Sequence, residues 1–191
     1  MALQRIDALG AIDVAFPSSP LVLTLGGTIR EMLAAVGRKP NHLYSLDAMG
    51  QTLGIGLGLA VGLEDQRSDK LVIVEGDGSL LMGFSTLATV GHLKPKNLLL
   101  IVLDNGVYLA TGGQPTAARD VDYAAVALAC GWAYASDVEP AALESALADA
   151  RDREGPVLLR VAVGTEQPKT DYFLEDPVVL AHDFTEWLAR G

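Results

Sequence analysis

Two oxygen-bearing side chains in this sequence each follow a continuous apolar run. Asp77 stands between two glycines directly after LVIVE, and Asn105 follows NLLLIVL and one aspartate. Such runs predict buried parallel strands, and ligands of an open parallel sheet bind at the carboxyl ends of its strands. If these strands are neighbours, Asp77 and Asn105 lie together on one rim. Carboxylate and amide oxygens are ligands that Mg²⁺ accepts, together with water and phosphate oxygens.

The residues around Asp77 suit a phosphate group as well as a cation. Gly76 and Gly78 let the main chain approach an anion closely, and a helix is predicted to begin near Ser79. The amide groups and the dipole at a helix N-terminus favour negative charge. The stretch therefore predicts a diphosphate bridged by a divalent ion. A Gly-Asp-Gly triplet alone is weak evidence, because most such triplets are turns.

The spacing of the two segments strengthens the prediction. With 26 residues between Gly78 and Asn105, the pattern resembles the cofactor-binding motif of the thiamine-diphosphate-dependent enzymes. The resemblance implies that Mg²⁺ is held by the side chains of Asp77 and Asn105 and by the main-chain carbonyl of Val107. It also implies that Gly76, Gly78, Ser79 and the neighbouring amide groups bind the diphosphate of the cofactor, thiamine diphosphate.

The similarity extends beyond the motif, from about Leu23 to Thr116, with a weaker echo in the terminal helix. Within the family, LDAMG, EGDGSLLMGFSTLATVG, KNLLLIVLDNGVY and TGGQPT resemble the sulfopyruvate and phosphonopyruvate decarboxylases. The resemblance implies a carboxy-lyase: the diphosphate- and Mg²⁺-binding subunit of a heteromeric 2-oxoacid decarboxylase. Its substrate would be a small 2-oxoacid similar to sulfopyruvate or phosphonopyruvate, and its products an aldehyde and CO₂.

Met49 lies 28 residues before Asp77, where the family places a bulky apolar residue beneath the cofactor. The resemblance implies that Met49 supports a bent cofactor, with the pyrimidine held against the thiazolium, while an ordinary core methionine is the alternative. The main-chain carbonyl of Asp47 is expected to accept a hydrogen bond from the cofactor's amino group. Here Asp47-Ala48-Met49-Gly50 departs from the commoner Gly-Ser-Met-Gly pattern, which is expected to shape the substrate pocket differently.

Two other segments supply further candidate contacts. Gly27 and Thr28 follow an apolar run and are candidates for the diphosphate, although Thr28 and Glu31 also have the spacing of a helix capping box. The glycine-rich loop after Asn105 brings polar groups beside the proposed metal site. The candidates in this loop for the cofactor, the diphosphate or the substrate are Tyr108, Leu109, Thr111, Gln114 and Thr116.

Few other side chains suit acid–base work or anion binding. His42 is a candidate for facing the site from its loop, whereas His92 is expected to close a helix. Arg30 and Arg119 are the only arginines expected near the site loops. The segment GIGLGLAVG does not fit a dinucleotide motif, and its glycines at every fourth position predict a helix face for close packing, including packing between subunits.

Strand-like and helix-like segments alternate along the chain. This order predicts an α/β fold, a doubly wound, mostly parallel sheet with helices on both faces, as in the thiamine-diphosphate-binding fold. A single domain is expected over residues 1–191, with 164–177 a mobile loop or tail. The expected strands are 21–25, 71–75, 97–103 and 156–163; the expected helices are 3–15, 28–36, 50–63, 80–91, 121–131, 140–151 and 177–189; loops are expected at 41–48 and 105–116.

One essential group has no candidate in the sequence. In this family a glutamate on a separate pyrimidine-binding domain activates the cofactor, and the roughly 75 residues before the Gly-Asp-Gly motif are already used by the expected strands. The activating glutamate is therefore expected on a partner chain, in a heterotetramer or a larger assembly. Much of the substrate recognition is expected to come from that partner as well.

Composition limits the partners and the location. The chain has 191 residues, is 50% hydrophobic and carries a net charge of -10, which argues against nucleic acid and anionic membranes as partners. Its longest apolar run, TLGIGLGLAVGL, is far shorter than the ~20 residues of a membrane span. The single Cys130 is expected to be a buried thiol. These features predict a soluble, cytoplasmic protein.

Two other functions remain open at this point. One is a carboligase of the acetolactate synthase type, which shares the cofactor and its site. The other is a catalytically idle cofactor-binding or regulatory subunit, against which the intact pair Asp77 and Asn105 counts. A plain nucleotide-binding domain has no phosphate loop to support it.

Overall fold

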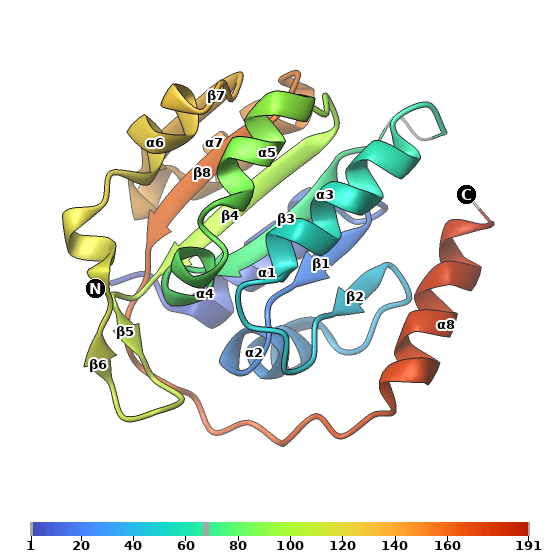
Figure 1. Cartoon of the computed structure of the whole chain (residues 1–191). Helices are drawn as coiled ribbons and strands as arrows, with labels where there is room; N and C mark the ends of the chain where they lie inside the picture. Colours follow the sequence, from blue (N-terminus) through green and yellow to red (C-terminus); the bar gives the residue numbers. More distant parts are fainter. Residues whose placement is uncertain (1, 67–68, 191) are drawn as a thin grey trace.

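A computed structural model describes residues 2–66 and 69–190, and its centre is a parallel sheet (Figure 1). Within the described residues the sheet has six strands in the order β2-β1-β3-β4-β8-β7, and each neighbouring pair is parallel. The strands are β1 (Leu21–Leu23), β2 (His42–Tyr44), β3 (Leu71–Gly76), β4 (Leu98–Asp104), β7 (Tyr134–Val138) and β8 (Val157–Ala162). The chain runs from β1 outward to β2 and returns to β3 on the other side of β1, so the winding reverses between β1 and β3.

Helices cover both faces of the sheet, as the sequence predicts. One face carries α1 (Arg5–Ala15), α2 (Gly27–Val36) and α7 (Leu143–Asp152), and the other carries α3 (Thr52–Leu63), α4 (Asp77–Met82), α5 (Thr86–Leu93) and α6 (Tyr123–Ala129). The last helix, α8 (Pro177–Leu188), packs beside the edge strand β2. Two short 3-10 helices, η1 (Ala117–Asp120) and η2 (Pro140–Ala142), and a small hairpin of β5 (Val107–Tyr108) and β6 (Gln114–Pro115) complete the described elements.

The central strands are mostly apolar because each of their faces is buried in a different core. In β3, Val72 and Val74 pack with α1 and α2, whereas Leu71 and Ile73 pack with α3 and α5. Burying one such side chain stabilises the fold by about 1.5–3 kcal/mol. No helix of the described residues is long and apolar enough to cross a membrane.

Two strands of the six-stranded sheet were not predicted from the sequence, and both lie at its edges. The expected loop 41–48 contains the short strand β2, and β7 lies where only a connection was expected. An edge strand has one neighbour and an exposed side, so it does not need a continuous apolar run. The sequence of β7, YASDV, shows this, because all of its residues are at least partly exposed.

The predicted helix 80–91 is in fact two helices, α4 and α5. Gly83 ends α4, and a Cβ atom added at Gly83 would overlap the carbonyl oxygen of Gly50. The chain therefore turns here because two main-chain segments touch. The helix also begins earlier than expected, at Asp77 itself.

The capping box predicted for Thr28 and Glu31 is wrong. Gly26, with a φ of 74°, is the residue before α2, and no side chain caps this helix. Glu31 instead binds the guanidinium of Arg5 across the α1–α2 contact. The Glu31 carboxylate is therefore engaged by a residue far away in the chain and does not form the local capping box.

The segment 164–176 has no helix or strand and passes along the carboxyl ends of the strands (Figure 1). Its contacts hold it against the domain. The Gly164 N–H donates to the carbonyl of Leu3, and the ring of Phe173 lies 5.0 Å from that of Tyr44. Near its end, Glu175 pairs with Arg38 at 2.9 Å. The mobility expected for 164–177 stays a prediction.

Candidate functional site

A cavity of about 180 Å³ lies at the carboxyl ends of β1, β3 and β4, beside the point where the winding of the sheet reverses. The predicted neighbourhood of β3 and β4 is confirmed, because Gly76 pairs with Leu103 at the end of the ladder. The predicted site residues that line this cavity are Gly27, Thr28, Met49, Gly76, Asp77, Gly78, Ser79, Asn105, Val107, Tyr108, Leu109 and Thr111. Asp47, Gln114 and Thr116 do not line it.

Asp77 is buried at the start of α4 and is held from two sides. The hydroxyl of Thr116 donates a 2.6 Å hydrogen bond to its Oδ2, and the hydroxyl of Tyr123 donates to its main-chain carbonyl at 3.3 Å. Burial raises the pKa of the Asp77 carboxyl, the hydrogen bond from Thr116 opposes this, and nearby Asp104 adds to the rise. A cation bound beside Asp77 would favour its ionised form.

Asn105 begins a tight turn at the end of β4. Its Oδ1 accepts a hydrogen bond from the N–H of Val107 at 3.0 Å, and Gly106 adopts a φ of 71° between them. An amide oxygen has two lone pairs, so this bond leaves Oδ1 one further position. The turn leads into the β5–β6 hairpin, which returns Thr116 to Asp77.

The oxygen atoms of this rim fit a hard divalent cation. Asp77 offers a carboxylate, Asn105 an amide oxygen and Val107 a main-chain carbonyl, which are the ligand types that Mg²⁺ accepts beside phosphate oxygens. The described residues contain no group of three or more His, Cys, Asp or Glu side chains placed to hold a metal. A cation here would therefore depend on neutral oxygens and on the oxygens of its ligand.

The glycines leave room for an anion at two strand ends. Cβ atoms added at Gly26 and Gly76 would meet no described atom within 4 Å. Gly78 differs, because a Cβ there would overlap the ring of Tyr108. The free amide groups at the start of α2, a helix of 10 residues, suit an anion. The site thus combines oxygen ligands for a cation with an open main-chain cradle for phosphate.

The hydroxyl of Ser79 connects the start of α4 with the loop that carries Met49 and with the end of β1. Its Oγ accepts hydrogen bonds from the N–H of Gly50 at 2.9 Å and from the hydroxyl of Thr24 at 3.2 Å. Beneath it lies the carboxyl of Glu75, surrounded by hydroxyl groups that include that of Thr52, and burial raises the pKa of Glu75. Because the hydroxyl is engaged within the protein, a diphosphate would meet the main chain of Ser79.

The loop that carries Met49 is fixed by its main chain. Asp47 has a φ of 51° and Gly50 a φ of 82°, and the Met49 side chain between them lines the cavity. A Cβ atom added at Gly50 would lie 2.9 Å from Cβ of Met82. The Asp47 side chain itself is exposed and does not line the cavity.

In the 105–116 loop, two predicted contacts bind each other. The hydroxyl of Thr111 donates to Oε1 of Gln114 at 3.0 Å, and Nε2 of Gln114 donates to the carbonyl of Thr111 at 3.1 Å. Both side chains are exposed, and only Thr111 lines the cavity.

Four polar residues of the described chain line the cavity without having been predicted as site residues: Arg5, Thr24, Arg30 and Gln167. The expectation that Arg30 and Arg119 are the only arginines near the site is wrong, because Arg5 lines the cavity whereas Arg119 is exposed and outside it. Arg5 reaches the rim from α1, and a Cβ atom at Gly27 would overlap its guanidinium. No local pattern around Arg5 signals this, since the contact depends on how α1 packs against α2.

His42 is buried away from the cavity. Its Nε2 lies 3.2 Å from Oδ1 of Asp13, and Lys39 binds the other oxygen of that carboxylate. Burial lowers the pKa of His42 to about 4. The carboxylate of Asp13 opposes this shift, and the ammonium group of Lys39 adds to it. His42 is therefore neutral near pH 7 and does not line the site for which it was a candidate.

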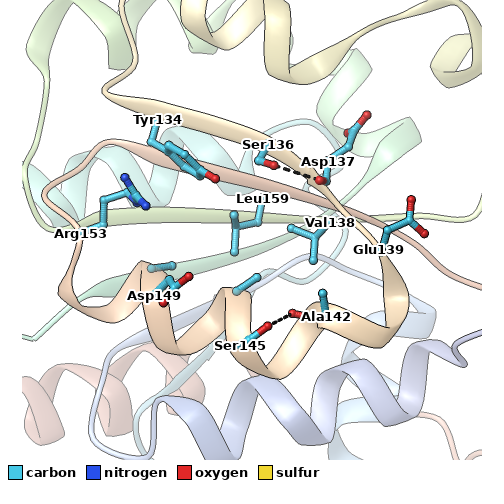
Figure 2. Close-up of a pocket in the computed structure, with 12 residues that line it drawn as sticks. Tyr134, Ser136, Asp137, Val138, Glu139, Ala142, Ser145, Asp149, Arg153 and Leu159 are labelled. Carbon is cyan, nitrogen blue, oxygen red and sulfur yellow. Dashed lines mark hydrogen bonds between the residues drawn. The ribbon is translucent and has the colours of Figure 1, made fainter.

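A second cavity, of about 270 Å³, lies between β7 and α7 (Figure 2). Its serine hydroxyls are already used, because Ser136 donates to the carbonyl of Asp137 and Ser145 to that of Ala142. Arg153 lies over the ring of Tyr134 at 4.0 Å. None of the residues with predicted chemistry lines this cavity, so we place the functional site at the ends of β1, β3 and β4.

Comparison with known proteins identifies the family of the chain. The family model described as "Thiamine pyrophosphate enzyme, C-terminal TPP binding domain" matches residues 27–161. The phosphonopyruvate decarboxylase of Streptomyces viridochromogenes is 39% identical over 160 residues, which are 83% of this chain and 39% of that protein. The sulfopyruvate decarboxylase subunit beta of Methanothermobacter thermautotrophicus is 36% identical over 163 residues, which are 85% of this chain and 83% of that subunit.

The chain thus spans about two fifths of the phosphonopyruvate decarboxylases and most of the beta subunit. Among solved structures, the benzoylformate decarboxylase of Polynucleobacter necessarius superposes with a TM-score of 0.73 at 19% identity. That superposition covers 88% of this chain and 34% of the other. At this identity it shows a shared fold.

Proposed function

This chain belongs to the thiamine pyrophosphate enzymes, as its motif predicted, and we propose that it is the cofactor-binding subunit of a heteromeric 2-oxoacid decarboxylase. Thiamine pyrophosphate is another name for thiamine diphosphate. The observation that carries the proposal is the meeting of Asp77 and Asn105 at neighbouring strand ends of one cavity.

In the proposed holoenzyme this chain holds the diphosphate through Mg²⁺. The ligands are the side chains of Asp77 and Asn105 and the carbonyl of Val107, and Thr116 orients the Asp77 carboxylate. Gly27, Thr28, Gly76 and Gly78 supply main-chain groups to the phosphates, and Met49 and the carbonyl of Asp47 support the other end of the cofactor. When bound, thiamine diphosphate supplies an electron sink for the carbanion that loss of CO₂ leaves behind.

The proposal places the activating glutamate on a partner chain. Among the described residues that line the cavity, the ionisable acid is Asp77, and no glutamate is present. The relative from Methanothermobacter thermautotrophicus is named a beta subunit, which supports a partner. We propose that a pyrimidine-binding subunit completes the site, in a heterotetramer or a larger assembly.

The face of α3 is the proposed contact for that partner. Ile55 and Val61 are 37% and 49% exposed, and Met82 of the neighbouring α4 is 63% exposed. Cβ atoms added at Gly54 and Gly58 would meet no described atom within 4 Å. The glycines predicted to allow close packing therefore face outward, where another chain can approach.

The proposed substrate is a small 2-oxoacid with a second anionic group, as in sulfopyruvate or phosphonopyruvate. The names of the relatives support this class. The chain binds and orients the cofactor, and the products are an aldehyde and CO₂. A carboligase would use the same cavity, and the product assay separates the two.

The test uses the complex of this chain with its partner subunit, thiamine diphosphate and Mg²⁺. Calorimetry should show that Asp77→Ala loses at least about tenfold in cofactor affinity. Asp149→Ala, which removes an exposed acid from the second cavity, is the matched control and should bind normally. Equal affinity of Asp77→Ala and the parent would reject the metal site, and failure to form aldehyde from either oxoacid would reject the decarboxylase.

A further inference from the structure

The cavity is more positive than the chain that forms it. The protein carries a net charge of -10, yet the ionisable side chains that line the cavity are Arg5, Arg30, Asp77 and Tyr108. Asp77 is proposed to bind the metal, so its negative charge is offset by the cation. Two arginines then remain to meet anions.

Arg5 is already neutralised by a buried carboxylate. Its Nε donates to Oε2 of Glu31 at 3.1 Å, and its Nη2 binds Oε1 of the same side chain. The two side chains are 11% and 3% exposed. This bidentate pair fixes Arg5 beside Gly27 but leaves it little net charge for a ligand.

Arg30 has no such partner. Within residues 2–66 and 69–190, no carboxylate forms an ion pair with it. Its guanidinium carbon instead lies 5.3 Å from the centre of the Tyr172 ring. A ring over the face of a guanidinium leaves the N–H groups along its edge free to donate. Arg30 therefore rests against a largely exposed ring, since Tyr172 is 80% exposed, and its N–H groups remain able to bind an oxyanion.

The 164–176 segment supplies this ring, Tyr172, beside Arg30. Tyr172 precedes Phe173, which is anchored on Tyr44, and Gln167 of the same segment lines the cavity with Arg30. The amide of Gln167 adds a neutral donor on this side. Arg30 and Gln167 thus give the same cavity a charged guanidinium and a neutral amide donor.

We propose that Arg30 binds the distal oxyanion of the substrate, its sulfonate or phosphonate, and so determines specificity. This inference rests on the proposed 2-oxoacid substrate. The charge of the diphosphate is met by Mg²⁺ and by the main-chain amides at the ends of β1 and β3. A dianionic substrate needs a cation of its own, because the chain that it enters carries a net charge of -10. A planar guanidinium offers paired donors to two oxygens of a tetrahedral anion.

The experiment compares Arg30→Gln, Arg30→Lys and the control Arg119→Gln, each in the complex with partner, thiamine diphosphate and Mg²⁺. Arg119 is exposed and outside the cavity. Calorimetry with 3-sulfopropionate, an analogue without a reactive keto group, measures the anion site directly. Arg30→Gln should weaken this binding by about tenfold to a hundredfold, Arg30→Lys should restore part of it, and Arg119→Gln should match the parent. Cofactor affinity should be unchanged in all three.

The possible results separate the inference from the function on which it rests. Unchanged 3-sulfopropionate binding in Arg30→Gln would overturn the inference, even if the parent makes aldehyde from sulfopyruvate. A parallel fall in thiamine diphosphate affinity would also overturn it, because Arg30 would then serve the diphosphate. If the parent makes no aldehyde but its 3-sulfopropionate site still depends on Arg30, the decarboxylase is rejected and the anion site stands.

Discussion

The hydroxyl of Thr116 donates a 2.6 Å hydrogen bond to Oδ2 of Asp77, although 39 positions separate the two residues in the chain. The β5–β6 hairpin makes this contact by returning the chain to α4. Thr116 also accepts a hydrogen bond from the N–H of Ala118, so its side chain is fixed at the start of η1. The bond fixes Oδ2, while the main-chain N–H groups of Asn105 and Gly78 also favour the ionised form of this carboxylate.

Thr116→Val should therefore weaken Mg²⁺ binding by the cofactor-loaded complex about tenfold, because residues that orient a metal ligand contribute at this level. Mg²⁺ titration followed by calorimetry gives the affinity. Thr116→Ser keeps the hydroxyl and should recover most of the loss. Thr185→Val, which removes an exposed hydroxyl from α8 outside the cavity, is the control. If the valine and serine variants bind Mg²⁺ equally, the hydrogen bond does not orient Asp77.

Gly78→Ala should lower cofactor affinity because its methyl group would overlap the ring of Tyr108. The ring would have to move, and overpacking of this kind costs about 1–3 kcal/mol. Urea unfolding measures the stability cost and calorimetry the thiamine diphosphate affinity. Gly10→Ala, in α1 away from the proposed partner contact, meets no described atom within 4 Å and should keep the parent's affinity while its stability rises by up to about 1 kcal/mol. Parent-like stability and affinity in Gly78→Ala would contradict the prediction.

His42 should make the folded chain less stable as the pH falls from about 6.5 to about 4. Its folded pKa is lowered to about 4, so between these values the unfolded chain binds more protons than the folded one, and stability rises with pH. Urea unfolding of the parent and of His42→Gln at several pH values tests this. The parent's slope should exceed that of the variant by up to about 1.4 kcal/mol per pH unit. Asp13 and Lys39 face the ring and are present in both proteins, so identical slopes would rule out a neutral His42.

Ile55→Lys should prevent assembly with the partner subunit without unfolding this chain. Ile55 is already 37% exposed on α3, so the substitution removes little buried area from the isolated chain. A charge placed at the centre of the proposed contact would have to be desolvated on binding. Val14→Lys, at a position 77% exposed on the opposite face, is the control. Size-exclusion chromatography of the mixed subunits measures assembly, and a normal complex with Ile55→Lys would place the contact elsewhere.

The parts of the site that follow from local sequence could be predicted, and those that depend on packing could not. Asp77 and Asn105 each follow an apolar run, and parallel strands bring their ends to one rim, so the proximity of this proposed metal-binding pair could be predicted from order and spacing. Arg5 and Thr116 act through contacts across 26 and 39 positions, which no pattern near either residue signals. The edge strand β7 was not predicted for a related reason, because an exposed strand is not required to be apolar.

The contact between Gly50 and Gly83 sets the span of the site. One residue follows Met49 and the other ends the helix that Asp77 begins, and there is no space between them for a side chain. The distance from Met49, the proposed pyrimidine support, to Asp77, the proposed diphosphate anchor, is thus determined by backbone atoms. Substitutions around the cavity can change which substrate is accepted, but a cofactor of different length would require an insertion or deletion in the chain itself.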